Sequence, residues 1–341
     1  MKLNFEQIKD ITIGAVRVEE ENGLINLYRF TKEQQELYKN RSQDFYMKTF
    51  ASAGIRLLFK TNSKNLALTV VTEKGSSRTY FSVDVFCDGK PVGFIDNYSD
   101  IKIPQMYTKL QLPFGEFSKS FQLGEGEKTV CIYLPWSAKT AIKELTFDDN
   151  AFISAIKPKK KLLAFGDSIT QGYDALRSSN RYVARLADKL GVEEINKGIG
   201  GEYFCADLAR FKEPFTPDYV LVSYGSNDWN RKTFDEFNVN CKAFYEAVSK
   251  NYPDSKIFAI TPIWRKDMDE ERPFGEFKKV DLCIKEAVMN LKNVTVITGF
   301  DFVPKEESYF ADLRLHPTDE GFEHYFNNLY DKIKGGVSDE S

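Results

Sequence analysis

Ser168 lies in the segment GDSITQG, residues 166–172, directly after the apolar run KLLAF. An apolar run of this length predicts a buried strand, and the glycines predict a sharp turn before a helix or loop. At a helix N-terminus, a serine hydroxyl is close to backbone N–H groups that can stabilise a developing oxyanion. Because a serine alcohol is a weak nucleophile by itself, this chemistry also requires a base.

The chain has only two histidines, His316 and His324. His316 lies in DLRLHPTDEGF, whereas His324 follows eight residues later in EGFEHYFNNL, which has the pattern of a terminal helix. Taken alone, a histidine before a proline is most simply interpreted as a polar loop residue. Taken with Ser168, it is the stronger candidate for the general base, and we expect the two side chains to meet.

Two further loops could supply hydrogen-bond donors. Gly201 ends the run NKGIGG after a short predicted strand, and a glycine there allows the backbone to approach a reacting oxygen closely. Asn227 lies in GSND, directly after the apolar run DYVLVSY. Each motif is common by itself. Four loops of this kind at corresponding strand ends, in this order, form a specific joint signal.

Other interpretations of these glycine-rich segments fail on particular residues. Tyr173 and Asp174 follow Gly172, where a phosphate-binding loop has a lysine and a hydroxyl residue. Tyr203 stands where a dinucleotide-binding fingerprint has its third glycine. No GxSxG occurs in the chain, which argues against an α/β-hydrolase.

The region before the GDSITQG segment has the pattern of an all-β domain. Short runs rich in β-branched and aromatic residues alternate with turn residues, as in GIRLLFKT, NLALTVVTE and KTVCIYLPW. Asp88 and Gly89 separate two more such runs, and this dipeptide favours a tight hairpin. Only TKEQQELYKN suggests a short helix. These patterns predict a β-sandwich or jelly roll over residues 1–155.

Residues 156–341 alternate apolar strands with amphipathic stretches, which predicts an α/β fold with a three-layer arrangement: a parallel sheet flanked by helices. In such a fold, ligands bind at the carboxyl ends of the strands. The segment AFISAIKPKKK, residues 151–161, contains a proline and four lysines. We interpret it as a solvated connector between the two domains.

Composition limits the classes of function. The chain has 341 residues, 28% of them charged, and a net charge of −3, which provides no basic field for nucleic acid. Its N-terminus lacks the apolar core of a secretory signal and no run approaches a membrane span, so we expect a cytoplasmic protein without membrane contact. The oligomeric state is left open. Five scattered cysteines predict free thiols: Cys87, Cys131, Cys205, Cys241 and Cys283.

The four loops together resemble the signature blocks of SGNH or GDSL-type hydrolases. The matching segments are FGDSITQG, NKGIGGE, YGSNDW and DLRLHP, between about residues 160 and 335, and the first and third match closely. The resemblance implies that Ser168 is the nucleophile and His316 the base. It implies an oxyanion hole made by the N–H groups of Ser168 and Gly201 and the side chain of Asn227. It implies no metal and no other cofactor.

The fourth block departs from the Asp-x-x-His pattern of the family. Leu313 stands three residues before His316, and the nearest aspartate, Asp312, stands four before it. A different turn could still bring Asp312 to the imidazole, and we predict it as the third catalytic residue. The alternative is a Ser-His dyad in which a backbone carbonyl orients the ring.

An N-terminal jelly roll followed by an SGNH domain resembles family-two carbohydrate esterases, which remove acetyl groups from sugars. This implies a serine esterase for short-acyl, mainly acetyl, esters of a small molecule or an acylated oligosaccharide. Candidate substrate-binding residues at the strand ends are Asp167, Trp229 and Trp264, whereas Trp136 is expected to be structural. Two alternatives remain: a non-catalytic carbohydrate-binding protein on a decayed hydrolase scaffold, and an esterase, lipase or thioesterase of non-sugar substrates.

Overall fold

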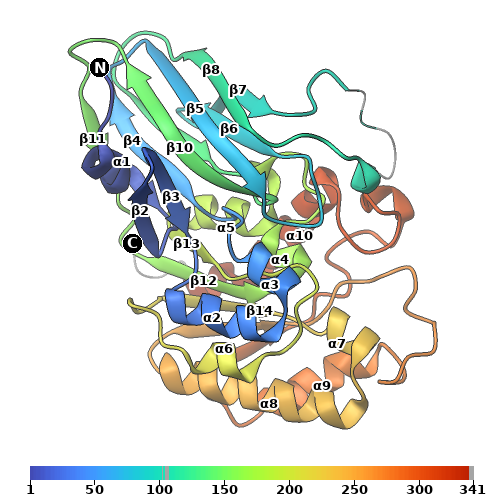
Figure 1. The fold of residues 1–341 in the computed structure, drawn as a ribbon. Coiled ribbons are helices and arrows are strands. Elements are labelled where there is room, and N and C mark those ends of the chain that lie inside the picture. Colours follow the sequence, from blue (N-terminus) through green and yellow to red (C-terminus); the bar gives the residue numbers. More distant parts are fainter. Residues whose placement is uncertain (102, 104–106, 338–341) are drawn as a thin grey trace.

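The computed structural model describes residues 1–101, 103 and 107–337, and it stacks an antiparallel β-sandwich on a parallel α/β domain (Figure 1). The antiparallel strands end with β11 at Ala155, and the parallel sheet begins with β12 at Lys161. We retain residues 155/156 as the proposed boundary between the two domains. Among the described residues, no helix has both the length and the hydropathy of a membrane span.

The N-terminal strands form two antiparallel sheets, as the alternating runs predict. Side chains alternate between buried and more exposed along β5, so that one face packs into a core shared by both sheets. The first sheet has the order β2 (Arg17–Glu21), β3 (Leu24–Tyr28), β10 (Ala138–Phe147), β5 (Asn65–Lys74) and β8 (Glu116–Gln122). The second has the order β1 (Thr12–Ile13), β4 (Arg56–Thr61), β9 (Lys128–Tyr133), β6 (Ser82–Cys87) and β7 (Lys90–Asp96), with β11 (Ile153–Ala155) on β4.

The C-terminal sheet is parallel throughout, and the predicted α/β class is confirmed. Its order is β13 (Glu193–Asn196), β12 (Lys161–Gly166), β14 (Tyr219–Ser223), β15 (Lys256–Ile260) and β16 (Val294–Ile297). Leu162 and Leu163 lie in different core clusters, because successive side chains of a strand point to opposite faces. The helices around the sheet are α5 (Tyr182–Leu190), α6 (Ala206–Arg210), α8 (Phe234–Asn251), α9 (Lys279–Val288) and α10 (Asp319–Val337).

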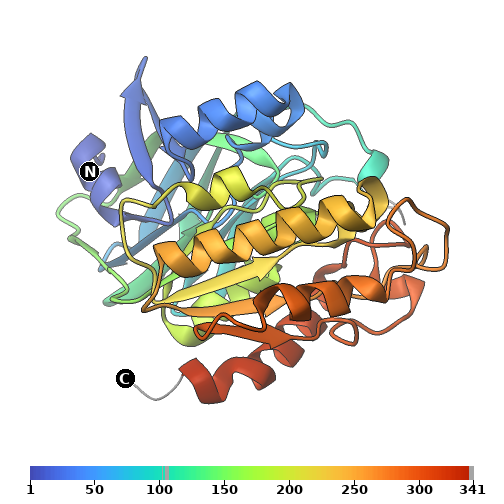
Figure 2. The ribbon, with the colours of Figure 1, turned by 90° about the horizontal axis from the view of Figure 1, so that it is seen from below.

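These helices divide between the two faces of the parallel sheet. Helices α5 and α10 share one core cluster with Leu162, whereas α6, α8 and α9 share the other with Leu163. Helices α8 and α9 lie side by side in both ribbon views (Figures 1 and 2). Both faces of the sheet are therefore covered, which leaves the ends of its strands as the accessible edges.

The N-terminal region also contains helices that the strand pattern did not predict. They are α1 (Phe5–Ile11) and α3 (Gln43–Lys48), beside the expected α2 (Lys32–Arg41). Both are shorter than two turns, too short for a clear hydrophobic period, and α1 is fixed locally by the capping box of Asn4 and Gln7. Tyr38 of α2 and Phe45 of α3 join the core cluster of the parallel sheet. Side chains from the first 155 residues thus pack into the core of the second domain.

The short helices are found mainly in loops. Helix α4 (Ser168–Gln171) follows β12, and α7 (Ser226–Arg231) follows β14. Three single-turn helices are η1 (Tyr107–Lys109), η2 (Ser178–Asn180) and η3 (Glu307–Tyr309). All five cysteines are free thiols.

Candidate active site

Ser168 is the first residue of α4, immediately beyond the carboxyl end of β12. The side chain of Asp167 caps this helix by accepting a 2.9 Å hydrogen bond from the N–H of Ile169. A Cβ at Gly166 would lie 2.1 Å from Oγ1 of Thr170, so the close turn from strand to helix requires a glycine at this position. The turn presents the Ser168 hydroxyl at the strand end, and the residue itself is only 4% exposed.

Three side chains form a continuous hydrogen-bonded chain. Ser168 Oγ lies 2.8 Å from Nε2 of His316, and His316 Nδ1 lies 2.8 Å from Oδ2 of Asp312. His316 belongs to the loop before α10, so the contact joins residues 148 positions apart. This order of alcohol, imidazole and carboxylate is the one in which an imidazole can take the proton of an attacking serine.

A longer turn explains why the aspartate stands four residues before the histidine. Leu313 has a φ of 57°, in the left-handed region, and Asp312 Oδ1 accepts hydrogen bonds from the N–H groups of Arg314, Leu315 and His316. Burial acts to raise the pKa of Asp312. The hydrogen bond and charge of His316, together with the backbone donors, outweigh burial and lower that pKa below its ordinary value. Asp312 is therefore a carboxylate at neutral pH.

The candidate oxyanion donors gather around one amide side chain. Asn227 Nδ2 donates to the carbonyl oxygen of Glu202 at 2.9 Å and lies 3.4 Å from Oδ2 of Asp167. These two residues are the sequence neighbours of Gly201 and Ser168. The N–H groups of Gly201 and Ser168 have no acceptor within the part of the chain that the structure describes. Asn227 thus joins the two segments that carry the candidate N–H donors.

Two buried cations from the N-terminal region hold the loop that carries Gly201. Arg29 is fully buried and donates through Nη1 to the carbonyl oxygens of Asn196, at 3.0 Å, and Gly198, at 2.6 Å. Lys48 Nζ donates to the carbonyl oxygen of Gly200 at 2.8 Å. Sequence analysis missed both cations. The oxygens that they bind in this loop are backbone oxygens more than 150 residues away, so no side-chain pattern marks these contacts.

The tryptophans occupy different environments. Trp229 is fully buried, and its indole N–H donates to the carbonyl oxygen of Gly275 at 2.8 Å. We predicted from sequence that Trp229 binds substrate, but its side chain packs in the core beside Phe277 and does not reach an accessible surface. Trp264 is half-buried and packs on Phe310 with ring centroids 5.3 Å apart, and Phe310 precedes the loop that carries Asp312 and His316.

Asp167 and Trp136 contact the loops that carry Ser168 and Gly201. Asp167 is 4% exposed, and burial raises its pKa to about 6. Trp136 is buried and donates from its indole to the carbonyl oxygen of Ala175. Its own carbonyl accepts from Gln171, which also accepts the N–H of Gly200. Trp136 is therefore a structural link between the sandwich and the loops that carry Ser168 and Gly201.

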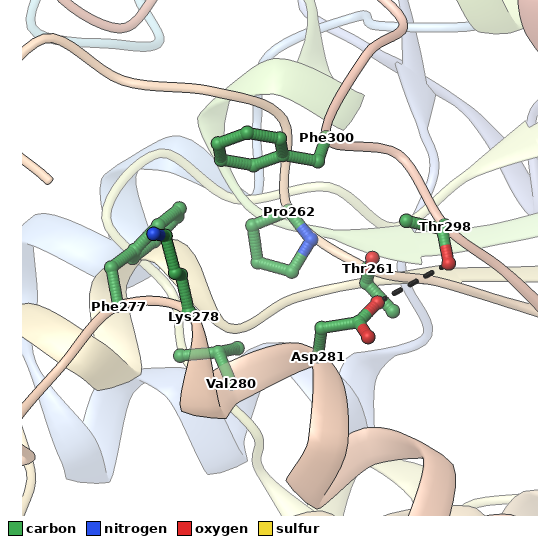
Figure 3. Close-up of a pocket in the computed structure, with 8 residues that line it drawn as sticks. All are labelled: Thr261, Pro262, Phe277, Lys278, Val280, Asp281, Thr298 and Phe300. Carbon is green, nitrogen blue, oxygen red and sulfur yellow. Dashed lines mark hydrogen bonds between the residues drawn. The ribbon is translucent and has the colours of Figure 1, made fainter.

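Two cavities lie near the carboxyl ends of the parallel strands. The one that Asp312 reaches has a volume of about 560 Å³ and a charged wall. Its other lining residues are Lys266, Asp267, Asp269, Glu270, Glu307, Leu313 and Arg314. The second has a volume of about 260 Å³, lies beyond β15 and β16 and is lined without a triad residue (Figure 3). Its lining residues are Thr261, Pro262, Phe277, Lys278, Val280, Asp281, Thr298 and Phe300.

One cluster of metal-ligating residue types overlaps the triad. Within the described residues, ligand atoms of Asp174, Asp312 and His316 lie within 4.8 Å of one another. The two carboxylates already accept hydrogen bonds, Asp312 from His316 and Asp174 from Arg78 and Tyr80. The cluster is thus a hydrogen-bond network in which each ligand atom has a protein partner.

Residues 164–324 match the model of the GDSL-like Lipase/Acylhydrolase family. The protein therefore contains a GDSL-like lipase/acylhydrolase domain, and the fold and hydrogen-bonded loops described above lie within or against it. No curated protein matched the sequence.

Solved structures with a similar fold include a putative GDSL-like lipase from Bacteroides ovatus ATCC 8483. It has a TM-score of 0.76 and 20% identity over 98% of this chain and 97% of that one. A salicylyl-acyltransferase, SsfX3, from a tetracycline biosynthetic pathway has a TM-score of 0.76 and 17% identity over 96% of this chain and 94% of that one. A family-two carbohydrate esterase from Cellvibrio japonicus has a TM-score of 0.66 and 15% identity over 99% and 98%. At these identities the likeness establishes the shared fold.

Proposed function

We propose that the protein is a serine esterase that hydrolyses short-acyl esters through an acyl-enzyme, with acetylated carbohydrates as its substrate class. The observation that carries the proposal is the hydrogen-bonded chain from Ser168 through His316 to Asp312. A serine 2.8 Å from an imidazole whose other nitrogen contacts a carboxylate has the arrangement that activates a hydroxyl as a nucleophile.

The geometry supports a two-step mechanism. Ser168 Oγ attacks the ester carbonyl while Nε2 of His316 takes the hydroxyl proton. Asp312 accepts the Nδ1–H of the same ring, which fixes the tautomer with a free Nε2 lone pair and stabilises the imidazolium. The negative oxygen is held by the N–H groups of Ser168 and Gly201 and by Nδ2 of Asn227.

The proton held by His316 is then passed on, first to complete formation of the acyl-enzyme and later to complete its hydrolysis. The imidazolium of His316 returns its proton to the departing alcohol, which leaves the acyl group on Ser168. His316 then takes a proton from a water molecule as the water attacks the acyl carbonyl, and returns it to Ser168 Oγ as the acid departs.

Two features support a short acyl group and a polar alcohol. Ser168 is only 4% exposed, which favours a small acyl group. The charged cavity reached by Asp312 suits a leaving group with many hydroxyls. Trp264 and Asp167 are proposed to contact the substrate. A solved family-two carbohydrate esterase from Clostridium thermocellum, 15% identical, is described in complex with cellohexaose.

A non-catalytic sugar-binding role is less well supported. A decayed scaffold would be under no constraint to keep an alcohol, an imidazole and a carboxylate in hydrogen-bonding contact, whereas all three are aligned here. Transfer of the acyl group to an alcohol other than water uses the same acyl-enzyme, and adding acceptor sugars to the assay distinguishes transfer from hydrolysis.

The proposal is tested with Ser168→Ala. Hydrolysis of p-nitrophenyl acetate and labelling by a fluorophosphonate should both disappear in this variant, while the exposed serine variant Ser154→Ala should keep both. Circular dichroism checks that Ser168→Ala remains folded. Persistent activity in folded Ser168→Ala would refute the nucleophile assignment. A panel of acetylated and longer-acyl sugars then tests the substrate class.

A further inference from the structure

A second carboxylate contacts the ring nitrogen that Asp312 holds. Asp174 Oδ2 lies 3.4 Å from Nδ1 of His316, while Asp312 Oδ2 lies 2.8 Å from the same atom. Asp174 is fully buried and follows α4 in the segment GDSITQGYDA, with a φ of 72°. A neutral imidazole has one Nδ1–H to donate, so the two carboxylates are potential competitors for it.

Residues of the β-sandwich domain hold Asp174 from the other side. Arg78 donates to Oδ1 through Nε at 2.6 Å and to Oδ2 through Nη2 at 3.0 Å. The hydroxyl of Tyr80 donates to Oδ1 at 2.7 Å, and the hydroxyl of Tyr107 donates to the backbone carbonyl oxygen of Asp174. Asp174 belongs to the hydrolase domain, so its carboxylate is neutralised across the domain boundary.

The positive charge of Arg78 offsets the electrostatic effect of the Asp174 carboxylate on the imidazole. A buried carboxylate without a counter-ion would stabilise the imidazolium and draw Nδ1–H away from Asp312. The two-pronged guanidinium contact uses both oxygens of Asp174 and makes the pair neutral. Burial acts to lower the pKa of Arg78, but the hydrogen bond and charge of Asp174 outweigh it and raise that pKa, so the guanidinium stays charged.

We propose that Arg78 of the β-sandwich domain is a positioning residue of the catalytic centre: by pairing with Asp174, it leaves Asp312 as the acceptor of His316 Nδ1–H and sets the basicity of the imidazole. The inference rests on the proposed function, because it concerns the base of that reaction. It also assigns the N-terminal domain a part in catalysis.

The other groups around His316 are the same in all variants at residues 78 and 174. The ring of Tyr173 packs against the imidazole with centroids 5.6 Å apart, and the charge of Asp167 also acts on it. The guanidinium of Arg314, in the same loop as His316, lies 3.4 Å from the carboxylate of Asp267. Differences between variants at residues 78 and 174 therefore report the pair itself.

The test is the pH dependence of fluorophosphonate labelling of Ser168, supported by kcat/KM for p-nitrophenyl acetate. Arg78→Gln removes the cation that pairs with Asp174. We expect the acid limb of the pH profile, where the labelling rate increases with pH, to move to higher pH by about one unit or more. Asp174→Asn leaves a cation near His316, and we expect the limb to move to lower pH. The double variant should fall between them, and Arg78→Lys, which keeps the charge, should stay near the parent.

Arg177→Gln is the matched control. Arg177 also pairs across the two domains, with Asp96 at 2.6 Å, and neither residue contacts His316. We expect this variant to keep the limb of the parent. Circular dichroism recorded at each pH checks that the variants stay folded, so that a moved limb reports titration and not pH-dependent unfolding.

Two results would overturn the inference: limbs of Arg78→Gln and Asp174→Asn that coincide with the parent, or limbs that move in the same direction. A purely structural role predicts loss of activity without opposite shifts. If Ser168→Ala abolishes labelling while these limbs coincide, the esterase proposal stands and only the role of Arg78 fails. If the parent is not labelled at all, the proposed function fails first.

Discussion

The ammonium of Lys48 donates a 2.8 Å hydrogen bond to the carbonyl oxygen of Gly200, and the N–H of the same glycine donates to Oε1 of Gln171. One peptide segment is thus held from two sides, by α3 of the N-terminal region and by the helix that begins with Ser168. Because Gly201 follows directly, its N–H direction depends on both contacts.

Lys48→Met tests this support. The apolar side chain keeps the packing of Lys48 but removes the donor, so the segment loses one fixed point. We expect kcat for p-nitrophenyl acetate to fall about 10-fold with a smaller change in KM, since loss of a whole oxyanion donor costs about 10²- to 10³-fold. Lys39→Met, at an exposed lysine of α2, is the control. Equal kcat values for the two variants would contradict a role for Lys48 in aligning Gly201.

Asn227→Ala tests the side-chain donor. We expect kcat to fall about 10²- to 10³-fold, because the amide stabilises negative charge that develops only in the transition state. Fluorophosphonate labelling and the thermal unfolding midpoint separate loss of catalysis from loss of fold. Asn240→Ala, at a half-buried asparagine of α8, should resemble the parent. A fall of only a few fold in Asn227→Ala would remove Asn227 from the proposed oxyanion hole.

Asp312→Asn distinguishes a triad from a dyad. The amide oxygen of asparagine can still accept the backbone N–H groups that Asp312 Oδ1 accepts, so the loop should keep its shape. The side chain can no longer stabilise an imidazolium, and loss of this carboxylate in Ser-His-Asp enzymes costs up to about 10⁴-fold. We expect kcat/KM to fall at least about 100-fold. Turnover within a few fold of the parent would favour the dyad.

Asp228 should make folding stability depend on pH. Its carboxyl is buried, with Oδ1 accepting from the N–H of Phe204 at 3.1 Å and Oδ2 without a partner among the described residues. Burial raises the pKa of Asp228 to about 7, above the ordinary value of about 3.9 in an unfolded chain. Between these values the folded protein binds a proton that the unfolded chain does not, so this group's contribution to stability falls as pH rises.

Urea unfolding at several pH values between 5 and 8 measures this effect. The free energy of unfolding of the parent should decrease more steeply with rising pH than that of Asp228→Asn, whose amide resembles the protonated acid. Asp167, whose pKa burial raises to about 6, contributes in the same direction in both proteins. Parallel slopes for the two proteins would mean that Asp228 ionises in the folded state as it does in water.

Local sequence patterns predicted much of the fold. The strands around residues 161, 219, 256 and 294 are apolar runs bounded by turn residues, and they pair in parallel as expected. Helices α1 and α3 escaped prediction because six or seven residues carry too little periodicity. Their positions depend on caps and on burial against distant strands, which a local window does not contain.

The sequence predicted those residues of the candidate site that belong to the four motifs. Ser168, His316 and Asp312 were named from sequence, and the structure brings them into one hydrogen-bonded chain. The left-handed backbone of Leu313, which makes the longer turn possible, could not be inferred from spacing. Trp229 directly follows its motif and yet is enclosed in the core. The supporting residues could not be found, because Arg29 and Lys48 bind backbone oxygens that look alike in any sequence.

The buried guanidinium of Arg29 has a consequence for protein engineering. It ties the sandwich to the peptide oxygens on which the neighbouring glycine loop depends, so a shortened enzyme that begins near residue 156 would have those oxygens unsatisfied. Swapping sandwich domains among relatives would meet the same obstacle. Chimeras should succeed only when Arg29 and its recipient loop are transplanted together.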